Sequence, residues 1–406
     1  DHFEQEEMVH KIIGGHVGLA KKLSGMIREN KICAYNFPQG VIVHMFREMA
    51  GGKKGILTHV GLDTFADPRV EGGKMNALAS EDLVEVVNVG GEEHLYYQAP
   101  SLQAALIRGT TADEAGNLTV EKEGVLLETM HLAAAAKNAG GIVIAQVEHI
   151  AQKGTLDPRK VTVPGILVDY IVQAPKEDHQ MHVKNPYNPS FTGEVKIPVS
   201  QVAAMPLHAK KVIARRCAME LKKGTAVNLG IGVPEGVALA ALEEGIADWM
   251  AMTIEAGAVG GIPASGYGLG ASANVEALIG QPNLFDIYDG GGLDIAFLGL
   301  AQADAQGNIN VSKFQGRMVG CGGFVNISQN TKKVIFCGTF TAGASSITIG
   351  PDGIHIIEDG SHIKFLKQVE QITFSGSYAA KHQQEVLYVT ERAVFRLAPE
   401  GLELIE

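Results

Sequence analysis

The sequence has little cysteine and no long apolar run. Its four cysteines show no CxxC spacing and are too few for a disulfide scaffold, so a reducing, cytoplasmic environment is expected. No stretch of about 18 apolar residues is present, which argues against a membrane-spanning helix, and the first residues do not resemble a signal peptide. Because the first residue is Asp1 rather than Met, we expect a further segment to precede it.

Basic residues are also in the minority. The 34 Lys and Arg residues stand against 45 Asp and Glu, which gives a formal net charge of −11 at pH 7. This balance argues against a general nucleic-acid binder, which needs cations to neutralise phosphates, but it is compatible with a local basic pocket for a phosphorylated cofactor. The remaining composition, 46% hydrophobic over 406 residues, is typical of an α/β enzyme with two or three domains.

Glycine is abundant, with 49 of the 406 residues against a usual share of ~7%. No collagen-like period accounts for this excess. The glycines cluster at predicted strand ends, where they let a backbone approach another molecule closely. The clusters lie at 230–236, 256–270, 290–292 and 320–323.

Two segments of the chain repeat each other. Residues 105–120 and 296–311 each contain an Asp-x-x-Gly-Asn turn between apolar runs, and each copy predicts a strand, a loop, the turn and a second strand. Further apolar strands are predicted at 142–145 and 334–337, at nearly the same offset. The sequence therefore predicts two related halves, each with its own α/β sheet.

These halves define three predicted segments: an N-terminal domain at 1–180, a connector at 181–200 and a C-terminal domain at 201–406. The stretch 176–196 is polar and contains two prolines within Asn-Pro-Tyr-Asn-Pro, so it is interpreted as an exposed connector.

A strand, a glycine loop and a helix follow one another at 225–244. The strand at 225–229 leads into Gly230-Ile231-Gly232-Val233-Pro234, and a helix is predicted at 235–244. Such a loop can wrap phosphate at a helix N-terminus, or it can be a tight turn without a ligand. It does not fit a dinucleotide fingerprint, because the spacing is GxGxxxG and Glu235 would oppose an anion. A nicotinamide-dependent dehydrogenase is therefore the weaker alternative.

Glu255 ends a predicted strand at 251–254 and opens a segment that is rich in glycine and almost free of polar side chains. A carboxylate is costly in such surroundings unless it is used, and ligands of open α/β sheets bind at the carboxyl ends of strands. A desolvated carboxylate is also a good nucleophile. The competing interpretation, a solvated loop glutamate or a helix cap, stays open on the pattern alone.

Two further segments offer hydrogen-bond donors. The glycines at 320–323 precede an apolar run at 324–327 that we predict to be a strand, and their amides could form an oxyanion site or only a close-packed turn. Gln39 offers a side-chain amide beside a Pro-Gly turn. Cys321 is a weak candidate nucleophile, because no histidine lies near it in sequence. His179 and His182 have the spacing of metal ligands but no third partner nearby, so no metal site is expected.

Taken together, several segments resemble the family I CoA-transferases, in particular the single-chain type in which two subunit-like halves are fused. The resemblance spans essentially the whole chain. Its most specific segments are 36–40, 154–158, 163–170, 254–257, 285–294 and 320–323.

The resemblance implies two related open α/β/α domains with the active site at their interface. It implies that Glu255 is the catalytic glutamate that becomes a glutamyl-CoA thioester, and that Gln39 and Gly322 assist it. Coenzyme A would be a substrate rather than a bound cofactor, a short carboxylic acid such as acetate would be the acceptor, and a homo-oligomer is expected. The residues implied in CoA binding are Gly230, Ile231, Gly232, Val233, Pro234, Gly320, Gly322 and Gly323.

The chain also departs from the family pattern. Ala256 stands where the family often has Ser, and residues 1–406 contain neither the glycine-rich strand–loop–helix unit with which the family's first half begins nor the family's C-terminal extension. We therefore expect an incomplete first sheet. A non-catalytic relative that binds acyl-CoA or a sugar phosphate remains the second alternative, although the retained Glu255 and its glycine loops disfavour it.

Overall fold

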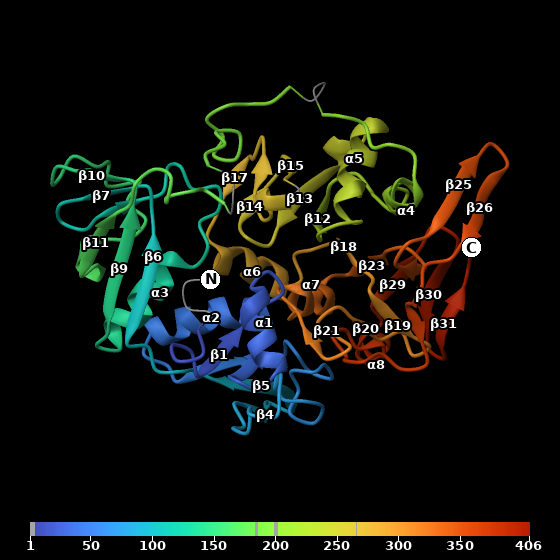
Figure 1. The fold of residues 1–406 in the computed structure, drawn as a ribbon, viewed down its shortest axis with the longest axis horizontal. Helices are drawn as coiled ribbons and strands as arrows, with labels where there is room; N and C mark the ends of the chain where they lie inside the picture. The colour runs from blue at the N-terminus through green and yellow to red at the C-terminus, as the bar shows by residue number, and fades with distance from the viewer. Residues whose placement is uncertain (1–4, 183–185, 199–201, 265) are drawn as a thin grey trace.

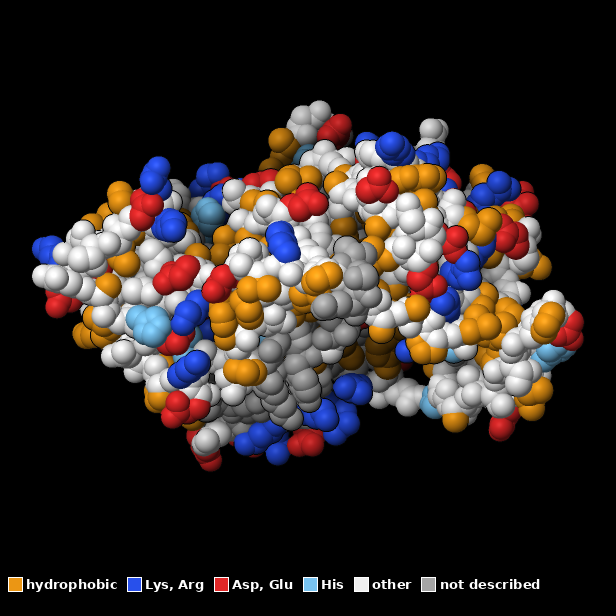
Figure 2. Space-filling model, turned by 90° about the horizontal axis from the view of Figure 1, so that it is seen from above, with side chains coloured by type: hydrophobic (Ala, Val, Ile, Leu, Met, Phe, Trp, Pro, Cys, Tyr) orange, Lys and Arg blue, Asp and Glu red, His pale blue; other side chains and the backbone are white. Residues whose placement is uncertain are grey.

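The computed structural model describes residues 5–182, 186–198, 202–264 and 266–406. Two α/β halves lie side by side, the first in blue and green and the second in yellow to red (Figure 1). Charged side chains of both signs, with apolar ones between them, are spread over the face seen from above (Figure 2). In the described part of the chain, no helix is long and apolar enough to cross a membrane.

Among the described residues the first half contains four small sheets, one of which has the order β10-β7-β8, with β7 (Thr111–Asp113), β8 (Leu118–Thr119) and β10 (His149–Ala151). Its central sheet is parallel and has the order β11-β9-β6, with α3 (Thr129–Asn138) packed on two of its strands. A parallel pair and an antiparallel sheet of order β3-β5-β4 complete this half, together with α1 (Lys21–Arg28) and α2 (Gln39–Ala50). The strands of the other three sheets are β1 (Lys11–Gly14), β2 (Cys33–Asn36), β3 (Gly55–Thr58), β4 (Val84–Val89), β5 (Glu92–Gln98), β6 (Ala104–Arg108), β9 (Ile142–Val147) and β11 (Tyr170–Gln173).

The second half is built on one nine-stranded sheet of order β17-β14-β13-β12-β18-β23-β29-β30-β31. Its five central strands are parallel to one another, and the outer strands pair antiparallel. The central strands are β13 (Met250–Ile254), β12 (Thr225–Leu229), β18 (Ile295–Gly299), β23 (Lys333–Cys337) and β29 (Glu385–Val389). The outer strands are β14 (Ala258–Val259), β17 (Ala277–Leu278), β30 (Val394–Ala398) and β31 (Gly401–Leu404).

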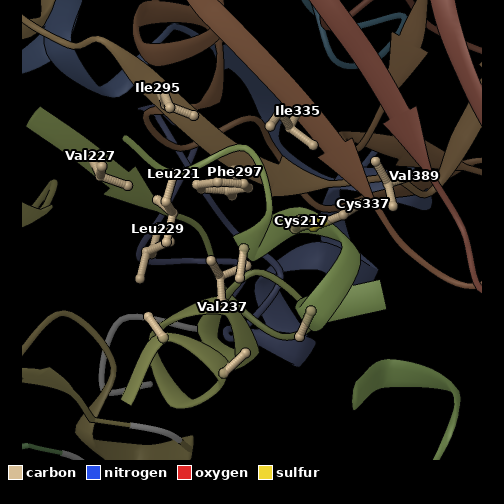
Figure 3. Close-up of a cluster of buried hydrophobic side chains, with 14 of the residues drawn as sticks. Cys217, Leu221, Val227, Leu229, Val237, Ile295, Phe297, Ile335, Cys337 and Val389 are labelled. Carbon is tan, nitrogen blue, oxygen red and sulfur yellow. The ribbon is translucent and has the colours of Figure 1, made fainter. Parts of the chain in front are cut away.

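Helices cover both faces of this sheet. Because side chains alternate along a strand, Phe297 packs in the cluster beneath α4 (Ala209–Ala218) and α5 (Glu235–Glu243), which Figure 3 shows. Its neighbours Ala296 and Leu298 pack on the opposite face, with α6 (Gln281–Asp289) and α7 (Phe324–Asn330). The predicted α/β fold class is thereby confirmed.

The repeated segments have the same structure in both halves. β6, β7 (Thr111–Asp113) and β8 (Leu118–Thr119) correspond to β18, β19 (Gln302–Asp304) and β20 (Ile309–Asn310). The next strands, β9 and β23, pair in parallel with β6 and β18. The predicted duplication is therefore confirmed.

The Asp-x-x-Gly-Asn turn keeps its hydrogen bonds in both copies. Asp113 Oδ1 accepts from the amides of Ala115 and Asn117, and Asp304 Oδ1 accepts from those of Gln306 and Asn308. In each copy the Asn side chain also donates to the second Asp oxygen, at 3.0 Å. The glycine of each turn, Gly116 and Gly307, has a positive φ of 89° and 81° that suits glycine.

Two predictions of local structure need correction. Residues 324–327 belong to the helix α7 rather than to a strand, because this short apolar run is buried between the two halves and its burial does not alternate. The connector is also less exposed than predicted. Its Met181 and Phe191 are buried against Ala271 and Ala273 of the second half. The boundaries at 180 and 200 stay a prediction.

Each of the two Asp-x-x-Gly-Asn turns packs against a glycine that has no room for a side chain. A Cβ on Gly376 would lie 2.1 Å from the Gln306 carbonyl oxygen, and one on Gly165 would lie 2.0 Å from that of Ala115. Gly376→Ala should therefore lower the free energy of unfolding by about 1–3 kcal/mol in urea titrations, because backbone must move. Gly25→Ala is the control, since a Cβ there meets nothing within 4 Å, and it should stabilise α1 by about 0.4–1 kcal/mol. Equal stability of Gly376→Ala and the wild type would contradict the argument.

Candidate active site

The carboxyl ends of three neighbouring strands of the second half meet in one cavity. β13 ends just before Glu255, β12 just before Gly230, and β18 at Gly299, and all three residues line a cavity of about 380 Å³. Parallel strands bring their carboxyl ends to one edge, which explains why residues distant in sequence converge here. The walls are largely apolar and include Leu229, Leu269, Leu298, Val311, Phe324 and Ile327.

The carboxyl group of Glu255 lies in a desolvated position. Burial raises its pKa from 4.5 to about 7, and a hydrogen bond from the Gly323 amide opposes this shift only in part. Among the described residues that line the cavity there is no Lys or Arg to neutralise the carboxylate. Glu255 is therefore ionised for only part of the time at neutral pH.

The glycines at 320–323 approach both Glu255 and the first half. A Cβ on Gly323 would lie 2.0 Å from Glu255 Oε2, and one on Gly320 would lie 2.6 Å from the carbonyl oxygen of Gly15. The Gly322 amide donates to that same carbonyl oxygen at 2.8 Å. Only glycine fits at these positions, and it is the Gly323 amide that faces the carboxyl group.

Gln39 of the first half contacts the 320–323 loop. It is the first residue of α2, and its backbone amide donates to the Gly322 carbonyl oxygen at 2.8 Å. Its Oε1 atom lies over Gly15, 2.2 Å from where a Cβ on that glycine would stand. The structure thus brings Gln39 and the 320–323 loop together, although 281 residues separate Gln39 from Gly320 in sequence.

Two residues that the sequence did not single out also belong to this junction. Asn36 is buried; its Nδ2 donates to the carbonyl oxygens of Gly14 and Gly15, both at 2.8 Å, and its Oδ1 accepts from the Cys321 amide at 3.1 Å. His16 lines the cavity beside Gly320, and partial burial lowers its pKa. Asn36 opens the Asn-Phe-Pro-Gln-Gly segment, a signal that could have identified it, whereas nothing in the sequence pointed to His16.

The loop at 230–234 contributes to the cavity through two of its five residues. Gly230 and Ile231 line the cavity, and the Gly230 amide donates to the Phe297 carbonyl oxygen at 2.8 Å. Val233 packs instead against the hydrophobic cluster beneath α5, which begins after Pro234. Glu235 is half-buried, and desolvation raises its pKa.

The remaining candidates have structural surroundings. Cys321 is buried, its pKa is raised by desolvation, and its Sγ contacts the Phe37 carbonyl oxygen at 3.7 Å, so it is unsuited to act as a thiolate nucleophile. His179 lies 3.5 Å from Glu123. In the described ranges, no group of three or more His, Cys, Asp or Glu is arranged to hold a metal ion.

The chain combines a duplicated α/β fold with a buried glutamate between its halves. Comparison with known proteins shows that it is an enzyme of the transferase class. The family described as Coenzyme A transferase matches residues 1–174. Over 99% of its length the chain is 49% identical to the caffeate CoA-transferase of Acetobacterium woodii and covers 78% of that protein. It is 41% identical to the acetate CoA-transferase YdiF of Escherichia coli K12, covering 99% of this chain and 76% of that one.

Solved structures agree with the sequence matches. The apoenzyme of the acyl-CoA transferase YdiF from Escherichia coli O157:H7 superposes with a TM-score of 0.94 at 40% identity, covering 99% of this chain and 76% of that one. The same enzyme in a thioester complex with CoA superposes with a TM-score of 0.92. The chain therefore belongs to the coenzyme A transferase family, and it is a CoA-transferase.

The raised pKa of Glu255 makes a prediction about stability. The folded protein holds this proton more tightly than the unfolded chain, so ionisation disfavours the folded state increasingly between about pH 4.5 and 7, and fully above that range. Glu255→Gln cannot ionise. It should be more stable than the wild type at about pH 8, by up to about 3 kcal/mol. The difference should vanish near pH 4.5.

Denaturant unfolding of both proteins across this pH range measures the difference. A difference of constant size at every pH would contradict the argument, because it would indicate a change of packing rather than of ionisation.

Proposed function

We propose that this enzyme transfers coenzyme A from a short-chain acyl-CoA to a carboxylate acceptor such as acetate, through a glutamyl-CoA thioester on Glu255. The observation that carries the proposal is the desolvated Glu255 carboxyl group at the carboxyl edge of the sheet, faced by the Gly323 amide. The identity to an acetate CoA-transferase and to a caffeate CoA-transferase supports it, and so does the thioester complex described for YdiF.

The proposed reaction has two symmetrical halves. The Glu255 carboxylate attacks the acyl-CoA thioester carbonyl, the C–S bond breaks, and an acyl–glutamyl anhydride and the CoA thiolate form. The thiolate then attacks the glutamyl carbonyl, which releases the first acid as a carboxylate and leaves the glutamyl-CoA thioester. The second carboxylate attacks this thioester, and the same two steps run in reverse to give the new acyl-CoA and free Glu255.

The surroundings of Glu255 suit these steps. A partly dehydrated carboxylate is more nucleophilic than a hydrated one, and an apolar cavity keeps water from hydrolysing the anhydride. Each attack builds negative charge on a carbonyl oxygen, which fixed hydrogen-bond donors stabilise. Because the nucleophile must be ionised, kcat/KM for acyl-CoA is expected to rise as the pH passes through about 7.

We assign the donors to both halves of the chain. The side-chain amide of Gln39 and the backbone amide of Gly323 are the proposed oxyanion donors. The predicted role of Gly322 requires that its amide release the carbonyl oxygen of Gly15. CoA binding by the 230–234 loop, by Gly320 and by Gly323, a homo-oligomeric state and a cytoplasmic location likewise stay predictions.

Covalent catalysis by Glu255 gives the sharpest test. Incubation with acyl-CoA alone should add the mass of CoA, less water, to a peptide that contains Glu255, and steady-state kinetics should be ping-pong. Glu255→Ala should abolish transfer. Glu255→Asp should be slowed ~100-fold, because its carboxylate is withdrawn by about 1 Å.

Glu391 provides the matched control. It is also buried and follows β29 of the same sheet, but it lies outside the cavity, where it accepts from the Phe340 amide. Glu391→Ala should still form the adduct on Glu255, even if the protein is less stable. Near-normal transfer by Glu255→Ala would refute the mechanism.

The role of Gln39 is tested by separating turnover from affinity. Gln39→Ala should lower kcat ~100–1000-fold, the usual loss for an oxyanion donor, with little change in the KM for acyl-CoA. Gln103→Ala is the control, since Gln103 is exposed and its side-chain amide donates to the Ser101 hydroxyl. A defect confined to KM would show that Gln39 only shapes the pocket.

A further inference from the structure

The N-terminus of α2 is satisfied by the other half of the chain. This helix begins after Pro38 and has no side-chain cap of its own. Its first two amides cross the interface instead: that of Gln39 donates to the Gly322 carbonyl oxygen at 2.8 Å, and that of Gly40 donates to Asn326 Oδ1 at 3.1 Å. The start of α2, and with it the Cα of Gln39, is therefore placed by the 320–323 loop and by Asn326.

The orientation of Asn326 is fixed from its other side. Asn326 is wholly buried on α7, and its Nδ2 donates to both carboxylate oxygens of Asp289, at 3.0 and 3.1 Å. An ionised carboxylate can only accept hydrogen bonds, so it holds the NH₂ group of Asn326 toward itself and leaves Oδ1 for the Gly40 amide.

The groups around Asp289 are consistent with this task. Burial raises its pKa to about 6, so it is mostly ionised at neutral pH. Asn330 Nδ2 donates to it at 3.3 Å, and His44 of α2 lies 3.5 Å away. The other carboxylate of α6, Asp286, is paired with Arg47.

The contact between α2 and α7 leaves no spare room. A Cβ on Gly40 would lie 2.3 Å from Asn326 Nδ2 and 2.6 Å from Phe285. The same phenylalanine ring lies 2.9 Å from where a Cβ on Gly323 would stand. Gly40 and Gly323 thus pack on one ring, so a shift of α2 changes the distance between Gln39 and the amide that faces Glu255.

We propose that Asn326, held by Asp289, is a positioning residue that acts through Gln39: it fixes the start of α2 so that the Gln39 side chain meets the oxyanion formed at Glu255. This inference rests on the proposed function, because it assigns the reason for the placement of a proposed donor. Asn326 itself contacts neither the cavity nor Glu255 in the described structure.

A double-mutant cycle tests the inference. Asn326→Ala should lower kcat ~10-fold with unchanged KM for acyl-CoA, counted per active site from the amount of Glu255–CoA adduct. In the Gln39→Ala background the same substitution should change kcat less than 2-fold, because the group it positions is already gone.

Two further variants keep the test informative. Asp289→Asn preserves the shape of the side chain but removes the carboxylate, which can only accept hydrogen bonds. If the Asn326→Ala protein does not fold, Asp289→Asn takes its place in the double-mutant cycle. Asn76→Ala is the control for losing a structural asparagine, since Asn76 donates to the Ile27 and Ile32 carbonyl oxygens away from the cavity. It should alter stability without altering kcat per active site.

The possible failures are distinguishable. A full ~10-fold loss in the Gln39→Ala background, or a smaller number of active sites with normal kcat, would overturn the positioning role alone. An unchanged kcat in Gln39→Ala would remove the proposed role of Gln39 and this inference with it. Absence of any CoA adduct on wild-type Glu255 would overturn the proposed function as a whole.

Discussion

The rest of this structure depends on one constraint. A carboxyl group is held in an apolar cavity, and only glycine allows the backbone to come so close to it. Glu255 has no cation beside it among the described residues lining its cavity. Its carboxyl group accepts a hydrogen bond from the Gly323 amide, and any side chain at Gly323 would collide with its Oε2 atom. The site therefore keeps the carboxyl group poorly solvated, which costs stability and makes its ionised form more nucleophilic.

The loop that carries Gly323 is held by residues of the first half. Asn36 ties the loop at 14–16 to the Cys321 amide, and the Gly322 amide donates to Gly15. The start of α2 is held in return by Gly322 and Asn326. Because the hydrogen bonds run in both directions across the interface, the candidate site is a property of the two halves together, and neither half contains it alone.

The two repeats differ at the carboxyl end of their first strands, β6 and β18. In the first repeat, Arg108 occupies the position that Gly299 has in the second. Arg108 is paired with Glu123 at 3.0 Å and donates to the Gln180 carbonyl oxygen, so charged side chains cover the carboxyl end of β6. Gly299 leaves the equivalent end of β18 open to the cavity. The same turn and strand pairing thus support a closed edge in one half and a binding cavity in the other.

The sequence by itself determined the elements whose signals are local. The repeat at 105–120 and 296–311 predicted the duplicated strands, the strand at 225–229 was predicted with its observed bounds, and Glu255 was placed at a strand end. These predictions succeed because turn chemistry and apolar periodicity depend on neighbouring residues. Only the tertiary structure decided that 324–330 is a helix, that His16 and Asn36 belong to the site, and which glycine amide faces Glu255. Each of these depends on contacts between segments distant in sequence, such as Glu255 with Gly323, 68 positions apart, and Asn36 with Cys321, 285 positions apart. At such contacts, burial and tertiary hydrogen bonds override local preference.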